Sequence, residues 1–409
     1  MASRFGAYRA VLADPRARAF SAAGFLARLP ISMTGIGTVL LVSLVTGSFG
    51  RAGLITGVGT AVGAAAAPLW GRVIDRAGQA RVLAGAGLVY AAGVSLVLAG
   101  VLRGWPLGAV LAAATLAGLG FSSAGGCVRA RWSHRLAGSP LLDTAFAVEA
   151  VLDEVVFIVG PVLVTFLATR VHPGAGLAVC AGVGLVGALA LAAQRSTEPP
   201  RGRHHRSHPA AGRLSAAVLA PVVLACWACG SVFGGMEVVV VAFARDAGVL
   251  PYAGVLLMCW AVGSLVAGVV TGTVTWRRGP VARFRVGAAL LALSLVPLPF
   301  VSAPWLMGTL LTVSGVAIAP TLIASVTVTQ TAVPAARITE ALGWTSTGIA
   351  AGVATGAAVL GPLIDRWGPD AGFVGVVGFG VLLAASVLLV RPFPGEPDPA
   401  PAVQPVAER

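Results

Sequence analysis

The chain has 409 residues, of which 57% are hydrophobic and only 11% are charged, and its mean hydropathy is +0.90. Soluble globular proteins carry about 25% charged residues, so this composition excludes an ordinary soluble protein, and the abundance of Leu, Val and Ala excludes a disordered one. All of the positive charge behind the formal net charge of +13 is Arg, which falls in short groups between apolar stretches and so does not indicate nucleic-acid binding. The composition predicts an integral membrane protein.

Apolar runs of about 20 residues, the length a helix needs to cross a bilayer, follow a polar, Arg-containing tail over residues 1–18. The runs do not alternate with polar residues, so they favour helices over the strands of a membrane barrel. Twelve spans are predicted in chain order: 19–45, 52–71, 81–102, 106–128, 144–168, 174–194, 215–243, 252–274, 284–302, 304–328, 339–363 and 371–390. The expected fold is all-α, with twelve transmembrane helices.

The polar stretch from Arg195 to Arg213 divides these spans six and six. The expected domains are an N-terminal six-helix bundle (1–194), a cytoplasmic linker (195–213), a C-terminal six-helix bundle (214–391) and a disordered cytoplasmic tail (392–409). The segments that face the side of the N-terminus hold 22 Arg and the opposite segments hold five. By the positive-inside rule both termini are cytoplasmic, and we expect a multi-pass protein of the bacterial cytoplasmic membrane.

Two groups of side chains look like metal or redox motifs. The linker contains His204, His205 and His208 without an accompanying carboxylate or Cys, which favours a solvated loop over a metal site. Cys226-x-x-Cys229 lies inside a predicted span without a second pair, which is typical of small apolar filling. We expect neither a metal nor a cofactor.

Two short patterns recur at equivalent places in the two halves, which indicates a duplicated six-helix unit. Gly71-x-Val73-x-x-Arg76-x-Gly78 recurs as Gly272-x-Val274-x-x-Arg277-x-Gly279, and Arg170-x-x-Pro173-x-Ala175-Gly176 recurs as Arg366-x-x-Pro369-x-Ala371-Gly372. The segment from Gly71 to Arg81 contains Asp75-Arg76 and Gly78 and resembles the loop signature of the major facilitator superfamily. The resemblance to this superfamily extends over about residues 15–391. The resemblance implies a secondary transporter of 6+6 helices. The second copy departs from the signature, because Trp276 stands where the acid would be.

Asp75 is expected at the inner mouth of the second span, where Arg129 or Arg131 could pair with it. The resemblance implies that this loop contacts the inner end of span eleven, near Thr339 and Glu340, in one of two conformations. The alternative is a plain turn with positive-inside Arg. The expected gate consists of Gly71, Asp75, Arg76, Gly78, Arg81, Arg129 and Arg131.

Ionisable residues inside a membrane are costly and therefore candidates for function. The fifth span carries Glu149, Asp153 and Glu154, and Arg28 in the first span lies at the depth of Asp153. Because Arg stays charged, it can hold one carboxylate ionised while a neighbour exchanges a proton. These four residues and Glu237 are the proton-coupling candidates. The alternatives are a permanent Arg28–Asp153 pair, an interfacial Glu149, and a Glu237 near the outer surface.

Gly160-Pro161 matches part of the Gly-x-x-x-Gly-Pro-x-x-Gly-Gly stretch that marks proton-driven exporters in the superfamily. Val156 replaces the first Gly of this stretch and Val164-Thr165 replace the last two. The partial match therefore supports export less strongly than a complete one. The substrate is expected near the midplane between the halves. Its candidate contacts, each of which could equally be a packing residue, are Met33, Thr34, Trp227, Phe233 and Trp344.

These observations predict a secondary transporter of a small organic molecule that works by alternating access, by proton-coupled efflux, as a monomer in the lipid bilayer. A proton-coupled importer is the alternative within this class. A membrane-embedded enzyme or a channel is the alternative outside it, and no His/Asp/Glu cluster with metal spacing supports the enzyme. Lys is absent, so no nucleotide-binding P-loop is present in the sequence. We expect no enzymatic activity.

Overall fold

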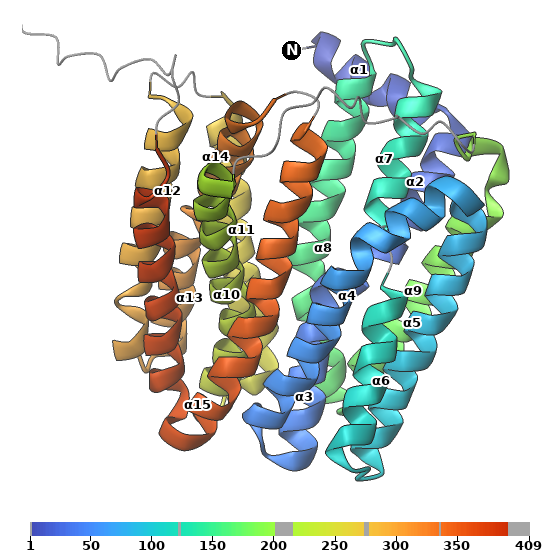
Figure 1. Ribbon diagram of the computed structural model, residues 1–409. Helices are drawn as coiled ribbons and strands as arrows, with labels where there is room; N and C mark the ends of the chain where they lie inside the picture. The colour runs from blue at the N-terminus through green and yellow to red at the C-terminus, as the bar shows by residue number, and fades with distance from the viewer. Residues whose placement is uncertain (1, 122–123, 201–215, 274–277, 335–336, 392–409) are drawn as a thin grey trace, which may run out of the picture.

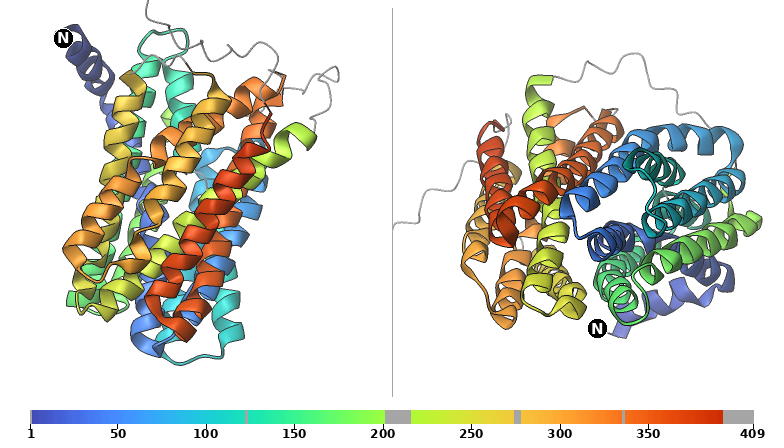
Figure 2. Two further views of the ribbon diagram at one scale, coloured as in Figure 1. Left: turned by 90° about the vertical axis from the view of Figure 1, so that its left-hand side faces the viewer. Right: turned by 90° about the horizontal axis from the view of Figure 1, so that it is seen from below.

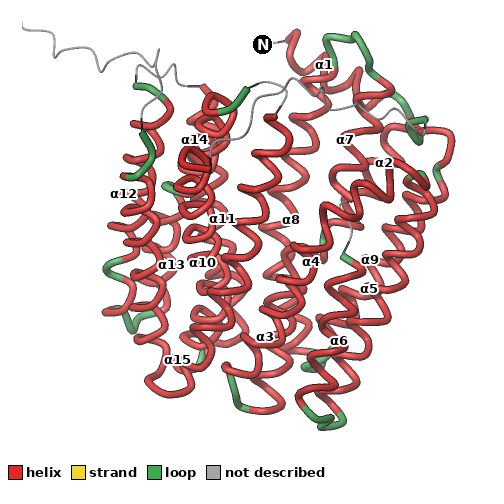
Figure 3. Tube along the Cα trace, viewed as in Figure 1, coloured by secondary structure: helices red, strands yellow, loops and turns green. Residues whose placement is uncertain are grey.

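The computed structural model describes residues 2–121, 124–200, 216–273, 278–334 and 337–391, and every regular element in these ranges is helical (Figures 1 and 3). The α-helices are α1 (Ala2–Ala13), α2 (Pro15–Arg28), α3 (Pro30–Thr46), α4 (Phe49–Ala77), α5 (Gln79–Leu102), α6 (Leu107–Gly120), α7 (Ala124–Arg135), α8 (Leu142–Arg170), α9 (Ala175–Ala193), α10 (Ala216–Asp246), α11 (Ala253–Thr273), α12 (Pro280–Leu295), α13 (Pro304–Gly315), α14 (Ile318–Ala332) and α15 (Ile338–Leu388). Short 3₁₀ turns η1 (Arg195–Thr197), η2 (Leu250–Tyr252) and η3 (Leu298–Phe300) join some of them.

Eleven helical stretches in the described residues are long and apolar enough to cross a membrane. One of them, within α15, is 49 residues long and contains Gly368, whose φ of 81° is not helical. Gly adopts a positive φ without steric strain, so the chain turns back there and α15 makes two crossings (Figure 1). The predicted all-helical fold with twelve spans is confirmed.

Three spans are broken where the apolar runs predicted continuous helices. The first span is α2 followed by α3, separated at Leu29, since Pro30 has no backbone N–H to continue the ladder. The fourth span is α6 followed by α7, and the tenth is α13 followed by α14. The predicted polar tail also differs: residues 2–13 form α1, and Asp14 caps α2 by accepting a hydrogen bond from the backbone N–H of Arg16 at 2.9 Å.

The helices form two bundles, α2–α9 and α10–α15, which lie side by side (Figures 1 and 2). We call the side where α1 lies and α15 ends the terminal side, and the opposite side, where α15 bends at Gly368, the far side (Figure 1). The bundles meet toward the far side. A Cβ atom on Gly53 of α4 would collide with the carbonyl oxygen of Ala357, and one on Gly254 of α11 with that of Pro161. Glycine at these positions permits the close approach of the two bundles.

Candidate functional site

The first bundle contains a buried charge network that joins α2 to α8. Arg28, at the end of α2, is 1% exposed and donates to Glu149 Oε2 at 2.5 Å and to Asp153 Oδ1 at 2.7 Å. Its Nε donates to the carbonyl oxygen of Gly24. Glu149 and Asp153 lie four residues apart, so they share one helix face and both reach the same guanidinium. The Arg28–Asp153 pair expected from the sequence is present, and Glu149 completes a triad.

Glu149 is completely enclosed by the first bundle. Its exposed fraction is 0%, and its Oε1 accepts hydrogen bonds from Trp132 Nε1 at 2.9 Å and from the hydroxyl of Ser21. The carboxylate therefore has three donors from α2 and α7. Trp132 and Ser21 were missed because no local spacing links them to Glu149.

Asp153 and Glu154 are neighbours with different surroundings. Asp153 Oδ2 accepts a hydrogen bond from Arg129 at 2.7 Å, so two Arg side chains hold this carboxylate. Glu154 makes no hydrogen bond or ion pair with any described residue. It is 7 and 11 residues before Pro161 and Thr165, which contact Gly254 of α11, so it lies on the α8 face that is turned toward the second bundle.

Glu237 of α10 lies where the two bundles meet. A Cβ atom on Gly35 of α3 would collide with Glu237 Oε2, so the carboxyl group packs directly on the α3 backbone. Thr56 of α4 also lines Gly35, and its buried hydroxyl is without a hydrogen-bond partner in the described part of the chain. Within the same ranges Glu237 has no cationic partner. Of the two places left open by the sequence, the contact with α3 favours the inter-bundle one over the outer surface.

The residues of the expected gate are divided between two places. Asp75, Arg76 and Arg81 are near the junction of α4 and α5, where Gly78 has a φ of 89°. Asp75 makes no hydrogen bond or ion pair among the described residues, and Glu340 pairs instead with Arg337.

Neither of the two Arg residues expected beside Asp75 pairs with it in this conformation. Arg129 is held by Asp153. Arg131 is buried and donates to the carbonyl oxygens of Leu191 and Gln194 at 3.0 Å, where it caps the C-terminus of α9. Its remaining hydrogen bonds go to Gln79 and Thr197. In the second copy of the loop pattern, residues 274–277, which include Trp276, lie outside the described residues.

The candidate substrate contacts are mostly engaged inside their own bundles. Met33 is 0% exposed in the core, and the Thr34 hydroxyl is hydrogen-bonded to the Tyr90 hydroxyl at 2.6 Å. Trp227 donates to Thr355 Oγ1 at 3.2 Å. Phe233 packs edge-on against Trp260 with ring centroids 5.5 Å apart, whereas Trp344 is 54% exposed.

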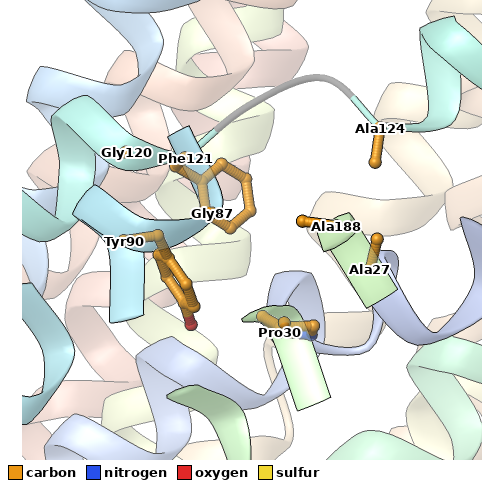
Figure 4. Close-up of a pocket in the computed structure, with 9 residues that line it drawn as sticks. Ala27, Pro30, Gly87, Tyr90, Gly120, Phe121, Ala124 and Ala188 are labelled. Carbon is orange, nitrogen blue, oxygen red and sulfur yellow. The ribbon is translucent and has the colours of Figure 1, made fainter. Parts of the chain in front are cut away.

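A cavity lies within the first bundle, beside the breaks in its first and fourth spans (Figure 4). Ala27 and Pro30 flank the first break, and Gly120, Phe121 and Ala124 flank the second. Most of the remaining lining is small, which leaves Tyr90 as the hydroxyl group at its wall. All of its lining residues belong to the first bundle, so the cavity is distinct from the inter-bundle position expected for a substrate. Among the described residues no group of three His, Cys, Asp or Glu is placed to hold a metal ion.

Residues 20–352 match the model of the Major Facilitator Superfamily. The chain belongs to this superfamily. Membership establishes a transporter rather than an enzyme, and it confirms the resemblance drawn from the segment between Gly71 and Arg81. No curated protein matches the sequence.

Solved structures of superfamily transporters share the fold at low sequence identity. A point mutant of the nucleoside transporter NupG is 15% identical with a TM-score of 0.73, covering 92% of this chain and 98% of that one. A peptide transporter POT in complex with sulfate is 13% identical with a TM-score of 0.71, covering 91% and 93%. The human organic anion transporter MFSD10 is 16% identical with a TM-score of 0.57, covering 91% and 100%. At such identities the likeness extends to the fold alone.

Proposed function

We propose that this superfamily transporter exports a small organic molecule across the bacterial cytoplasmic membrane by alternating access, in exchange for protons, and that it works as a monomer. The observation that carries the proposal is the contrast between carboxylates held by Arg28 and the two, Glu154 and Glu237, that have no cationic partner in the described residues. Both residues lie in membrane-spanning helices, where a charge without a partner is costly. A proton removes that cost, so Glu154 and Glu237 are the groups that bind and release it.

The two carboxyl groups differ in their access in this conformation. Glu237 lies against Gly35, where the bundles touch, whereas Glu154 lies closer to the terminal side on the α8 face turned toward the second bundle. We assign the terminal side to the cytoplasm, since the positive-inside rule favours that orientation for 22 of the Arg residues against five. The bundles then meet on the outer side, as in an inward-facing state. Opening the far side would part Glu237 from Gly35 and give it access to the outer medium.

The proposal is tested by flux through purified protein in proteoliposomes, with and without a pH gradient. The compound panel takes one member of each class named for the neighbours (a nucleoside, a dipeptide, an organic anion) and adds a lipophilic cation. We expect wild-type efflux to follow the pH gradient. Glu154→Gln and Glu237→Gln should retain exchange of the compound across the membrane but lose the response to the gradient, because neither amide can exchange a proton.

Two matched variants control for the loss of a carboxylate as such. They are Asp143→Asn, at an exposed position in the first turn of α8, and Asp246→Asn, at the end of α10. Both should couple as the wild type does. Flux that ignores the pH gradient, or Gln variants that couple normally, would refute proton coupling. Proton-driven uptake of the compound, in the direction opposite to export, would instead establish a proton-coupled importer. The importer is the alternative because the residues around Gly160-Pro161 match the exporter stretch only in part.

A further inference from the structure

A carboxylate of the second bundle caps a helix of the first bundle on the far side. Asp365 of α15 accepts hydrogen bonds from the backbone N–H groups of Phe49 at 2.7 Å and Gly50 at 2.8 Å, and from the Ser48 hydroxyl at 2.7 Å. Phe49 and Gly50 are the first two residues of α4. A negative charge at a helix N-terminus meets unpaired N–H groups and the positive end of the helix dipole. Asp365 thus joins the bundles at a position where no charge was singled out in the sequence.

The sequence around Asp365 repeats the loop signature at the other end of the same helix pair. Gly71-x-x-Ile74-Asp75-Arg76-x-Gly78 and Gly361-x-x-Ile364-Asp365-Arg366-x-Gly368 share five of eight positions. Gly78 and Gly368 both have positive φ, at 89° and 81°, and each ends a helical segment three residues after its Asp. The two segments therefore have the same local structure, a carboxylate in the last turn of a helix that is stopped by a glycine with positive φ.

The two copies lie at opposite ends of α4 and the first segment of α15, which run antiparallel where they meet (Figure 1). Gly53 approaches Ala357 and Gly57 approaches Ala354, so one sequence ascends as the other descends. Asp365 ends its segment beside the start of α4, and Asp75 ends α4 on the terminal side, where α15 begins. In this conformation Asp365 is engaged and Asp75 has no partner in the described ranges.

We propose that Asp365 is the far-side latch of the transporter, the counterpart of Asp75, and that each carboxylate caps the other helix of the α4–α15 pair in one of the two states. The proposal rests on the alternating access of the proposed function. Asp365 has no contact with substrate in it and acts as a positioning residue. When the bundles part on the far side, the start of α4 moves away from α15 and the three hydrogen bonds break together. When they close on the terminal side, Asp75 reaches the start of α15.

Glycines allow this latch to close. Gly50 lies against Asp365 and Pro362, and a Cβ atom on Gly361 would collide with the carbonyl oxygen of Phe49. The backbones of α4 and α15 consequently come close enough for a short Asp side chain to reach two consecutive N–H groups. Charge-assisted hydrogen bonds of this kind are stronger than neutral ones. Their loss selectively disfavours the state that contains them.

The test measures the distance between spin labels on the far side of the two bundles in reconstituted protein. Labels at Arg103→Cys, at the end of α5, and Trp305→Cys, at the start of α13, report this distance. Both side chains are exposed, and Cys259→Ser removes the one native cysteine that is not buried. Asp365→Ala should shift the ratio of open to closed far side by about tenfold toward open, with Asp365→Asn intermediate because its amide oxygen still accepts. Asp75→Ala should shift the ratio in the opposite direction, and the double variant should return toward the wild-type ratio.

Asp370→Ala is the matched control, since this exposed carboxylate lies five residues beyond Asp365 on the same side. It should leave the distances unchanged. Ser48→Ala, which removes one of the three donors, should give a smaller shift in the direction of Asp365→Ala. Equal distances in Asp365→Ala, Asp370→Ala and the wild type would overturn the latch. The measurement needs no transported compound, so a failure of proton coupling or of the export direction leaves its outcome unaffected.

Discussion

The two bundles join their first and fifth spans by different means. In the first bundle Arg28 of the first span binds Glu149 and Asp153 of α8. In the second bundle α10 and α15 meet closely through glycine, since a Cβ atom on Gly234 or Gly352 would collide with a backbone carbonyl of the other helix. The first bundle thus joins these two spans through a charge network, and the second bundle joins them through close backbone contact. Among the described residues this charge network lies in the first bundle, while the second bundle reaches a similar packing through glycine.

The largest effect expected from this comparison is the loss of Arg28. Arg28→Ala leaves Glu149, with an exposed fraction of 0%, without its cation. Removing one partner of a buried ion pair costs about 3–5 kcal/mol, so we expect a large fall in the thermal unfolding midpoint in detergent. The control is Arg129→Ala, because Arg129 binds Asp153 with its side chain 45% exposed and should cost less than about 1 kcal/mol. Similar midpoints for the two variants would show that the network does not stabilise the first bundle.

The glycine contacts of the second bundle should produce the next effect. Gly352→Ala places a methyl group against the carbonyl oxygen of Trp227, and overpacking of this kind costs about 1–3 kcal/mol. Gly343→Ala on the same helix meets open space and should leave the unfolding midpoint unchanged or raise it, since Ala favours helices over Gly. Opposite signs for the two substitutions are the expected result. A destabilised Gly343→Ala would indicate that helix flexibility, and not contact with α10, explains the need for glycine.

The smallest effect concerns an exposed ion pair at the edge of the first bundle. Burial raises the pKa of Asp14, but hydrogen bonds from Arg135 and from backbone N–H groups outweigh it and hold the pKa below the ordinary value of 3.8. A carboxylate whose pKa is lowered by folding stabilises the folded state at pH values above its unfolded-state pKa. This contribution is lost as the pH falls through the folded-state pKa. Asp14→Asn, which keeps the cap, should cost less than about 1 kcal/mol at pH 7.

The unfolding midpoints of wild type and Asp14→Asn should then converge below about pH 4. A difference that persists at lower pH would assign the effect to packing around α2. The same comparison at raised salt separates the two kinds of charge, since Arg28 and Glu149 are buried and should respond less to added salt than Asp14 and Arg135.

Much of the fold follows from hydropathy, because an apolar run of about 20 residues has few alternatives to a helix in a bilayer. The break at Leu29 could be anticipated only from Pro30, and an apolar run that contains a proline is compatible with both a kink and a new helix. The pairing of Arg28 with Asp153 was predictable from equal depth in the membrane. Trp132 and Ser21 were not, since their approach to Glu149 depends on how α2 and α7 pack on α8.

Asp365 illustrates a different limit. The repeated Gly-x-x-Ile-Asp-Arg-x-Gly pattern is visible in the sequence, but its second copy lies at the far-side end of a span, where a charged residue is ordinarily interpreted as part of a solvated loop. Its meaning depends on the antiparallel contact between α4 and α15, which joins positions more than 300 residues apart. Long-range pairing of this kind leaves no local periodicity.

The length of the first segment of α15, from Ile338 to Trp367, determines how far one end of this helix moves when the helix rotates about its other end. At 1.5 Å per residue it is a rod of about 45 Å, and its glycine-backed contact with α10 leaves little room for bending. A rotation of about 10° around the Asp365 end displaces the Ile338 end by about 8 Å, by the same geometry. In the alternating access that we propose, a small rotation about the Asp365 end therefore produces a displacement of ångströms at the Ile338 end.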